Sequence, residues 1–510
     1  MEALDWLVIG VFFLALIGII VWVVRQKQND SADYFLGGRD ATWLAIGASI
    51  FASNIGSEHL IGLAGAGASS GMAMAHWEIQ GWMILILGWV FVPFYTRSMV
   101  YTMPEFLERR YNPQSRTILS VISLVSYVLT KVAVTVYAGG LVFQQVFGIK
   151  ELWGIDFFWI AAIGLVVLTA LYTIFGGMKS VLYTSVLQTP ILLLGSLIIL
   201  VLGFKELGGW DEMMRVCGAV TVNDYGDTMT NLIRSNDDAN FPWLGALIGS
   251  AIIGFWYWCT DQFIVQRVLS GKNEMEARRG TIFGAYLKLL PVFLFLIPGM
   301  IAFALHQKYI GAGGEGFLPM LENGTANADA AFPTLVAKLL PAGVKGLVVC
   351  GILAALMSSL ASLFNSSAML FTIDFYKRFR PQTSEKKLVG IGQVATVVIV
   401  ILGILWIPIM RSVGDVLYTY LQDVQSVLAP GIAAAFLLGI CWKRTSAQGG
   451  MWGLISGMVI GLTRLGAKVY YSNAGEVADS TFKYLFYDMN WLFFCGWMFL
   501  FCIIVVIVVS

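Results

Sequence analysis

The sequence predicts an all-α protein that crosses a membrane many times. Its 510 residues are 58% hydrophobic and only 12% charged, which is more apolar surface than one water-soluble core would bury. Apolar runs repeatedly reach the roughly 20 residues that span a bilayer as a helix. The weak alternation that is typical of an outer-membrane barrel is absent. Two of the runs are interrupted by polar residues near their centres, and these interruptions give the first indication of function.

The apolar runs predict thirteen helices. Because acidic Glu2 and Asp5 follow Met1 at once, we expect the first run to be an uncleaved spanning helix rather than a signal peptide. The polar connections at 207–240 and 308–333 are too short to form separate domains. The predicted helices cover residues 5–24, 42–65, 73–99, 115–147, 155–174, 178–206, 242–270, 281–307, 341–376, 386–410, 414–440, 447–467 and 487–509.

Lysine and arginine residues fall in alternate connections between these helices. Short cytoplasmic loops carry an excess of such residues, so the pattern predicts that the N-terminus lies outside. The acidic stretch from Asp211 to Asp238 then lies outside as well. The basic residues expected on the cytoplasmic side are Arg25, Lys27, Arg39, Arg109, Arg110, Arg116, Lys272, Arg278, Arg279, Lys377, Arg378, Arg380, Lys386, Lys387, Lys443 and Arg444.

The interruption at residues 50–59 (IFASNIGSEH) replaces apolar side chains with small, polar and ionisable ones. In hydrocarbon, the backbone groups freed by such a break must be satisfied by neighbouring protein or by an occupied cavity. Transporters use broken helices in this way, with unwound carbonyls around a cation and side chains around a solute. The alternative is a packing helix weakened by glycine. A second polar interruption at 254–262 (GFWYWCTDQ) favours the transporter interpretation.

Each interruption opens a block of five predicted helices, as the two inverted repeats of a transporter require. We therefore expect a single transmembrane transporter domain over residues 1–510. Its expected parts are an N-terminal helix and cytoplasmic loop (1–41), a first inverted repeat (42–206), a second inverted repeat (242–440) and C-terminal flanking helices (441–510).

Ionisable side chains inside the predicted spans are few, and Glu78 and Lys288 lie deepest. Because burying a charged group in hydrocarbon is costly, each of these residues suggests a functional site and needs an interaction partner. One interpretation is a structural ion pair that fixes helix register. The other is a solute site in which these two residues, together with Asn54, His59 and Gln422, offer donors and acceptors to the hydroxyls of a neutral polyol.

Two further features bear on a solute and a cation. Tyr257 and Trp258 could stack on a sugar ring, although each alone is also an ordinary packing residue. The adjacent hydroxyls of Ser358 and Ser359, together with freed carbonyls at 52–55, could hold a cation, although serine pairs also mediate close helix packing. The sequence has no CxxC, HExxH or P-loop motif and no basic tract, so neither an enzyme nor a nucleic-acid partner is expected.

These residues stand in motifs that run almost end to end along the chain. On these motifs the chain resembles the sodium/glucose cotransporters of the solute:sodium symporter family, which implies a LeuT-type fold with two five-helix inverted repeats and extra flanking helices. The motifs are residues 33–39 (DYFLGGR), 51–57 (FASNIGS), 257–262 (YWCTDQ), 266–267 (QR), 286–289 (YLKL), 356–360 (LMSSL), 436–439 (FLLG) and 442–444 (WKR).

By motif position, the resemblance implies site residues for a transported monosaccharide and for transported Na⁺. Histidine at position 59 is similar to the glucose-transporting members rather than to those with glutamine there. The implied sugar ligands are Asn54, His59, Glu78, Tyr257, Trp258, Lys288 and Gln422. The implied sodium ligands are the backbone oxygens of Ala52, Ile55 and Ala355 and the hydroxyls of Ser358 and Ser359. The implied gates are Leu63, Trp77 and Tyr418 on the outer side and Tyr257 on the inner side.

Two departures from the family pattern carry predictions. Members that move two sodium ions have an aspartate where this chain has Ser185 and a hydroxyl residue where it has Ala361, so we expect one sodium per glucose or galactose. The connection 308–333 lacks the cysteines of animal members, which favours a bacterial inner-membrane protein. A symporter for inositol or another solute, and a sodium-dependent sugar sensor without net transport, remain the alternatives.

Overall fold

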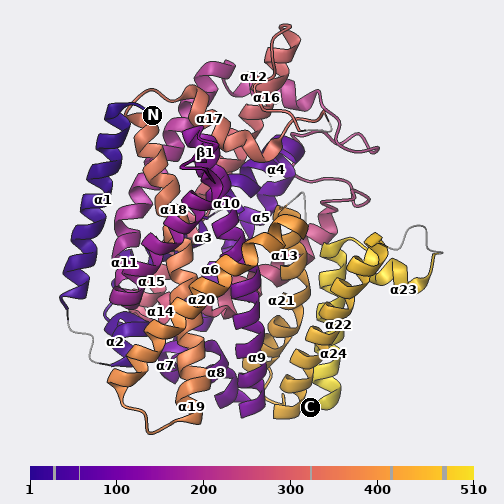
Figure 1. Ribbon diagram of the computed structural model, residues 1–510. Coiled ribbons are helices and arrows are strands. Elements are labelled where there is room, and N and C mark those ends of the chain that lie inside the picture. Colours follow the sequence, from indigo (N-terminus) through magenta and orange to yellow (C-terminus); the bar gives the residue numbers. More distant parts are fainter. Residues whose placement is uncertain (27–29, 57, 322–323, 414–416, 474–478) are drawn as a thin grey trace.

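A computed structural model (Figure 1) describes residues 1–26, 30–56, 58–321, 324–413, 417–473 and 479–510. Within these ranges, the side chains of 129–130, 409–413, 417–423 and 472–473 are not described. Nine helices in the described part of the chain are long and apolar enough to cross a membrane, and the helices Trp43–Asn54 and Ala133–Phe147 are shorter but also apolar. The chain is therefore a multi-pass membrane protein.

The first half of the chain forms the helices α1 to α11, joined by segments of 3-10 or π-helix labelled η. A two-stranded hairpin of β1 (Glu151–Leu152) and β2 (Ile155–Asp156) precedes α11. The elements are α1 Ala3–Val24, α2 Ser31–Leu36, η1 Gly37–Arg39, α3 Trp43–Asn54, η2 Glu58–Leu63, α4 Ala64–Ser70, η3 Gly71–Met74, α5 Ala75–Ile79, η4 Gln80–Trp82, α6 Met83–Ile86, η5 Leu87–Phe91, α7 Val92–Ser98, α8 Met103–Arg110, α9 Pro113–Ser126, η6 Tyr127–Val132, α10 Ala133–Phe147 and α11 Phe157–Leu207.

The second half repeats the alternation of long and broken helices. Its last helices, α21, α22 and α24, pack together at one edge of the molecule (Figure 1). The elements are α12 Trp210–Gly218, α13 Trp243–Gly254, η7 Phe255–Thr260, α14 Gln262–Leu269, α15 Glu274–Leu287, η8 Val292–Leu296, α16 Ile297–Gly311, η9 Ala328–Ala330, α17 Ala331–Leu339, α18 Val344–Met369, η10 Leu370–Tyr376, α19 Lys377–Phe379, α20 Glu385–Val413, α21 Leu417–Cys441, α22 Ala447–Asn473, α23 Thr481–Lys483, η11 Tyr484–Asp488 and α24 Trp491–Val509.

Both predicted interruptions are confirmed as breaks in helical geometry. Helix α3 ends at Asn54, and the next residue, Ile55, is extended, with φ −76° and ψ 106°. At the second break the π-helical segment η7 ends at Thr260, and Asp261 is extended, with φ −75° and ψ 127°. Each break therefore frees backbone groups inside a membrane-spanning region, where hydrocarbon cannot satisfy them.

The helix boundaries near Gly177 and Lys288 show where the prediction holds and where it does not. The expected helices 155–174 and 178–206 are confirmed as two helices within α11, which meet at a kink at Gly177 (φ 53°, ψ −150°), a conformation that favours glycine. The expected continuous helix 281–307 is wrong. It begins earlier, at Glu274, and is interrupted between Leu287 and η8, beside Pro291, which has no N–H for a helical hydrogen bond.

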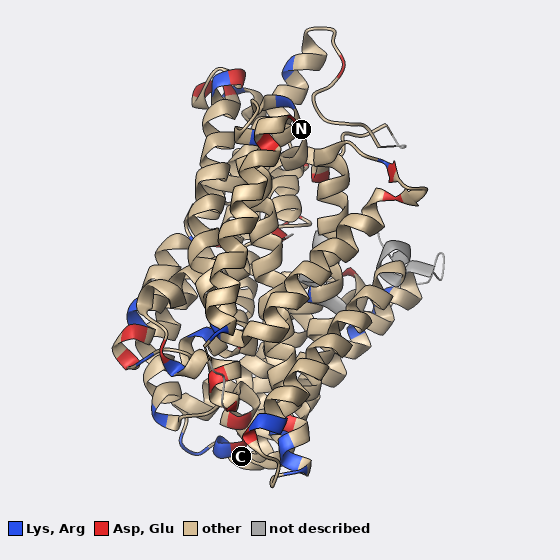
Figure 2. Ribbon diagram, turned by 60° about the vertical axis from the view of Figure 1, so that its left-hand side comes forward, with Lys and Arg blue, Asp and Glu red and all other residues tan. Residues whose placement is uncertain are grey.

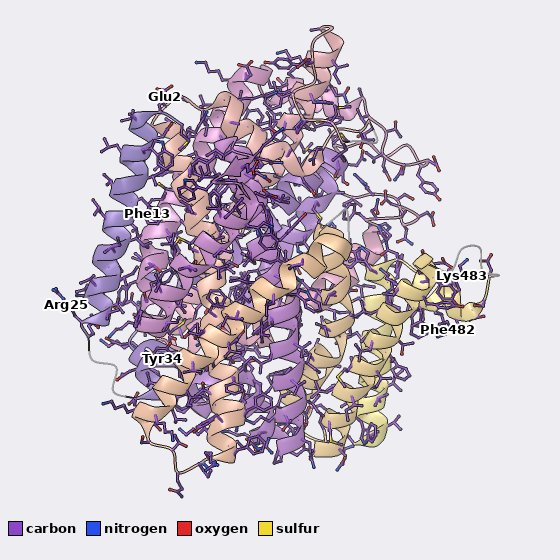
Figure 3. The ribbon with its side chains drawn as sticks, in the orientation of Figure 1. Glu2, Phe13, Arg25, Tyr34, Phe482 and Lys483 are labelled. Carbon is purple, nitrogen blue, oxygen red and sulfur yellow. The ribbon has the colours of Figure 1, made fainter. Side chains whose placement is uncertain are left out.

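The placement of the charged residues and the close packing of the helices are those of a membrane-spanning protein. Lysine, arginine, aspartate and glutamate gather mainly at the two ends of the helices, with a largely uncharged band between them (Figure 2). Glu2 and Arg25 flank the apolar helix α1 at opposite ends (Figure 3), and Leu14 between them is 71% exposed, as a lipid-facing side chain would be. In the interior, α3 and α15 approach so closely that a Cβ on Gly47 would lie 2.8 Å from the Gly280 carbonyl oxygen.

Candidate functional site

A cluster of buried polar side chains surrounds the break in α3. Lys288 follows the last residue of α15, and its ammonium reaches across to the first broken helix. Its Nζ donates a hydrogen bond to Asn54 Oδ1 at 2.5 Å, lies 2.8 Å from His59 Nε2 and forms an ion pair with Glu78 Oε2 at 2.6 Å. Because all four residues are buried, Lys288 is the centre of a network shielded from solvent.

The network contains one full positive charge and one full negative charge in contact. An unpaired charge in such a place would be strongly unfavourable, so Lys288 and Glu78 require each other. His59 lies between them, with its Nε2 3.2 Å from Glu78 Oε1. The ion pair that the sequence suggested is therefore present, and it is surrounded by hydrogen-bonding groups of the kind that bind hydroxyls.

Two aromatic residues of η7, at the second break, complete one side of the cluster. The Tyr257 hydroxyl accepts a hydrogen bond from Asn54 Nδ2 at 3.0 Å. The Trp258 ring lies 5.6 Å from Lys288 Nζ, within reach of a cation–π interaction. The structure thus brings together six of the seven residues predicted to bind sugar, from both broken helices. The seventh, Gln422, has a side chain outside the described part of the chain.

The predicted outer gates lie beside this cluster in sequence. Leu63 ends η2 and is buried, and Trp77 precedes Glu78 on α5. The Trp77 ring makes an edge contact with Trp491, with centroids 5.6 Å apart, so it also joins α5 to the start of α24. The side chain of Tyr418, the third predicted outer gate, is not among those described.

The predicted sodium ligands lie where α3 meets α18. Ala52 and Ile55 at the first break are buried, as are Ala355, Ser358 and Ser359 on α18. A Cβ added to Gly56 would be 3.2 Å from Ser359 Oγ, so the broken backbone lies directly against this serine.

Two further serines join these helices. The Ser53 and Ser362 hydroxyls are 2.8 Å apart, and Ser362 donates to the carbonyl oxygen of Ser358. Neither serine was predicted as a ligand, because a serine on a packed helix face is common.

Ser185, one of the two positions that the family resemblance ties to a second sodium ion, also lies at this junction. Ser185 Oγ is 3.2 Å from Ser358 Oγ and donates to the carbonyl oxygen of Val181 at 2.6 Å. Ala361 is buried one turn along α18 from Ser358. No carboxylate is therefore contributed at either position.

A small cavity connects the two predicted sites. Its lining includes Asn54 and Tyr257 from the sugar set, Ser359 from the sodium set, and Glu58 and Lys131. The predicted ligands of the two solutes thus face a common space. The position of Lys131 beside Tyr257 was not predicted from the sequence.

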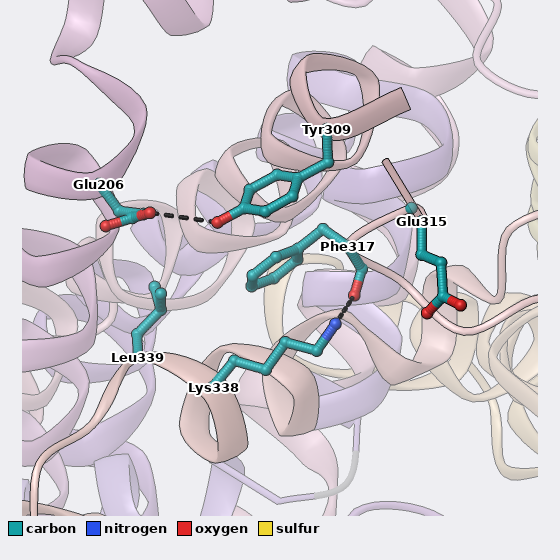
Figure 4. A pocket seen from close by; sticks show the side chains of 7 residues that line it. Glu206, Tyr309, Glu315, Phe317, Lys338 and Leu339 are labelled. Carbon is teal, nitrogen blue, oxygen red and sulfur yellow. Dashed lines mark hydrogen bonds between the residues drawn. The ribbon is translucent and has the colours of Figure 1, made fainter. Parts of the chain in front are cut away.

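A larger pocket lies away from this region, at the ends of α11, α16 and α17 (Figure 4). In it the Tyr309 hydroxyl donates to Glu206 Oε1 at 3.2 Å, and Lys338 Nζ donates to the carbonyl oxygen of Phe317 at 2.7 Å. None of the predicted site residues lines this pocket, so the buried cluster at the two breaks remains the candidate site.

Comparison with solved structures defines the class of protein. The fold matches that of an outward-open Na⁺-coupled sialic acid symporter with a TM-score of 0.78, at 21% identity, over 99% of this chain and 97% of that one. The predicted fold class, an all-α protein with a LeuT-type core, is confirmed.

Residues 34–457 match the sodium:solute symporter family, and the chain belongs to this family. Its curated relatives include sodium/myo-inositol cotransporter 2 of Homo sapiens, 38% identical over 91% of this chain and 70% of the relative. They also include sodium/glucose cotransporter 2 of Rattus norvegicus, 38% identical over 96% of this chain and 75% of the relative. The chain is therefore a Na⁺-coupled solute symporter.

Proposed function

We propose that this chain carries a neutral monosaccharide, glucose or galactose, together with sodium into the cell by alternating access. The observation that supports this most directly is the Lys288 network, in which an ammonium, a carboxylate, an amide and an imidazole converge within hydrogen-bonding distance. Sugar hydroxyls both donate and accept hydrogen bonds, and leaving water is costly for them unless such partners replace it.

Charge balance favours a neutral solute over an anionic one. The positive charge of Lys288 is already matched by Glu78 at 2.6 Å. An anionic solute in contact with this pair would meet a carboxylate as well as an ammonium, whereas a polyol can use both. Tyr257 and Trp258 lie in edge-to-face contact, at an interplanar angle of 85°, so only one of the two rings can stack on a given face of a pyranose or of a cyclitol.

A cyclic polyol such as myo-inositol is the second candidate. It has hydroxyls around a six-membered ring, as glucose does, and the relatives named for myo-inositol and for glucose are equally similar to this chain, at 38% identity. The choice between them depends on the placement of single hydroxyls, because a site with buried hydrogen-bonding groups rejects an analogue that leaves one unpaired.

We infer a coupling of one sodium ion per solute, held by the carbonyls of Ala52, Ile55 and Ala355 and the hydroxyls of Ser358 and Ser359. Sodium there would order the break in α3, and with it Asn54 and His59. A potential of ~100 mV supplies ~2.3 kcal/mol per charge. A roughly tenfold sodium gradient adds ~1.4 kcal/mol, and the sum corresponds to about 500-fold accumulation. One ion is therefore sufficient for scavenging.

The test is uptake of labelled glucose into proteoliposomes under an inward sodium gradient, with a potassium gradient as control and unlabelled galactose, myo-inositol and sialic acid as competitors. Sodium-dependent accumulation that glucose or galactose suppresses supports the proposal. Accumulation of labelled myo-inositol instead would favour the second candidate. Sugar binding without accumulation would replace the symporter proposal with a sodium-dependent sensor.

We further propose a bacterial inner membrane as the location, with the N-terminus outside. The placement of basic connections supports the orientation. Labelling of single cysteines placed in the connection 308–333 by a membrane-impermeant reagent in intact cells would test it, and labelling only after cell lysis would contradict it.

A further inference from the structure

A second buried ion pair lies under the candidate sugar site and has no role in binding as described above. Lys131, in the π-helical segment η6, places its Nζ 2.7 Å from Asp261 Oδ2. Both side chains are almost fully buried, at 5% and 2% exposure. A buried pair of this kind is expensive to form and is weak evidence for stability alone, so its location calls for an explanation.

The ammonium of Lys131 is also enclosed by aromatic rings. Its Nζ lies 4.6 Å from the ring centroid of Tyr257 and 4.9 Å from that of Phe263. The rings of Tyr127 and Trp256 follow at 5.2 and 5.5 Å. Cation–π attraction is largest where the cation is desolvated, so this aromatic box stabilises the charge and at the same time fixes the position of the rings, including Tyr257.

Asp261 is the extended residue at the second break, and its carboxylate holds that break in shape. Oδ1 accepts hydrogen bonds from the Phe263 N–H, at 3.1 Å, and from the Tyr127 hydroxyl. The Tyr127 hydroxyl in turn accepts from the Phe263 N–H at 3.0 Å. The start of α14 is thereby tied to η6, which belongs to the first half of the chain.

Tyr257 belongs to both clusters. Its hydroxyl accepts from Asn54 in the candidate sugar site, while its ring faces the ammonium of Lys131. If Tyr257 moved away from Asn54, its ring would separate from Lys131, or Lys131 would have to follow it and leave Asp261. The movement of this tyrosine is therefore coupled to the Lys131–Asp261 pair.

We propose that Lys131 and Asp261 form a latch that holds Tyr257 over the candidate site and has to release before solute leaves toward the inner side. This inference rests on the proposed function and on the inner-gate role that the family resemblance implies for Tyr257. Lys131 is a positioning residue in this scheme, since it lines the small cavity but contacts the predicted sugar ligands through the ring of Tyr257.

The test measures uptake of radioactive sodium into proteoliposomes without any sugar, in the wild type and in the neutral pair Lys131→Met/Asp261→Asn. This double substitution removes both members of the ion pair, so neither charge is left buried without the other. The matched control is Arg234→Met/Asp238→Asn, which neutralises another buried pair, in the connection between α12 and α13. Reconstituted amounts and melting temperatures are compared for all three proteins.

A loosened inner side lets sodium cross without solute, so we expect the leak to rise by about tenfold in the Lys131/Asp261 variant and not in the control. An unchanged leak, or an equal rise in the control, would overturn the latch. Because the readout needs no sugar, a wild type that fails to accumulate sugar refutes the proposed function without deciding the latch. A sugar-accumulating protein whose leak is unchanged in the variant refutes the latch alone.

Discussion

Lys288 makes more contacts in the candidate site than any other predicted ligand whose side chain is described, and its removal has two separable consequences. Lys288→Ala leaves the Glu78 carboxylate buried without its partner at 2.6 Å, a change that costs about 3–5 kcal/mol of stability. It also removes the donor to Asn54. We expect sugar uptake to be lost and the melting temperature to fall.

The double variant Lys288→Met/Glu78→Gln distinguishes a ligand from a structural ion pair. It removes both charges and retains side chains of similar size, so we expect the melting temperature to recover while sugar uptake stays at least about tenfold below the wild type. Uptake with a half-saturating sugar concentration close to the wild-type value would assign the pair to helix register and not to binding.

A substitution of Ser359 tests the predicted sodium site. It lies against the broken backbone at Gly56 and lines the cavity shared with Asn54. We expect Ser359→Ala to raise the half-saturating sodium concentration about tenfold, because a hard cation loses one oxygen ligand. Ser196→Ala, which removes a buried serine of α11, is the control. Wild-type sodium dependence in Ser359→Ala would refute the assigned site.

At the scale of elements, close backbone approach decides where helices pack. A Cβ on Gly299 of α16 would lie 1.9 Å from the Ala64 carbonyl oxygen of α4, whereas one on Gly164 of α11 would meet nothing within 4 Å. Overpacking of this kind costs about 1–3 kcal/mol. We expect Gly299→Ala to lower the melting temperature in detergent and Gly164→Ala to leave it unchanged or raise it. Equal melting temperatures would contradict this packing.

Asp329, in the short segment η9, makes the stability of the folded protein depend on pH. Asp329 lies against Gly65 of α4, and burial raises the pKa of its carboxyl to about 6. The folded protein then binds a proton that the unfolded chain, with a pKa near 3.9, releases. This contribution to stability is present at low pH and is lost as pH rises through about 6. Asp329→Asn should flatten the fall in melting temperature between about pH 4 and 6, and an unchanged profile would contradict the shift.

Comparison of sequence and structure is most informative for these elements. The polar residues at 50–59 and 254–262 predicted both breaks, since hydrocarbon tolerates them for few other reasons. The interruption beside Lys288 was missed, because a lone Pro291 in an apolar run also occurs in continuous kinked helices. The approach of Lys131 to Tyr257 was missed for a different reason. It depends on how helices far apart in the sequence pack together, and the hydrophobic periodicity of a sequence does not show this packing.

The number of sodium ions carried with each solute molecule is a property of the whole transporter. At the two positions that the family resemblance ties to a second sodium ion, this chain places the Ser185 hydroxyl beside Ser358, and Ala361 contributes no oxygen from its side chain. We expect a sodium-to-sugar flux ratio near one, measured with both labels in the same vesicles. The variant Ser185→Asp/Ala361→Thr supplies the missing oxygens and should move the ratio toward two. A wild-type ratio near two would show that the second ion is held elsewhere.

The polar groups around Lys288 are already bonded to one another, and this affects the enthalpy of sugar binding. With Asn54, His59 and Glu78 already joined to Lys288, an entering hydroxyl exchanges with bonds that the protein already makes. Sugar binding at this site exchanges one set of hydrogen bonds for another, and the total number of hydrogen bonds hardly changes. Calorimetric titration should therefore record a small enthalpy for sugar, and selectivity should come from analogues that break a bond without replacing it.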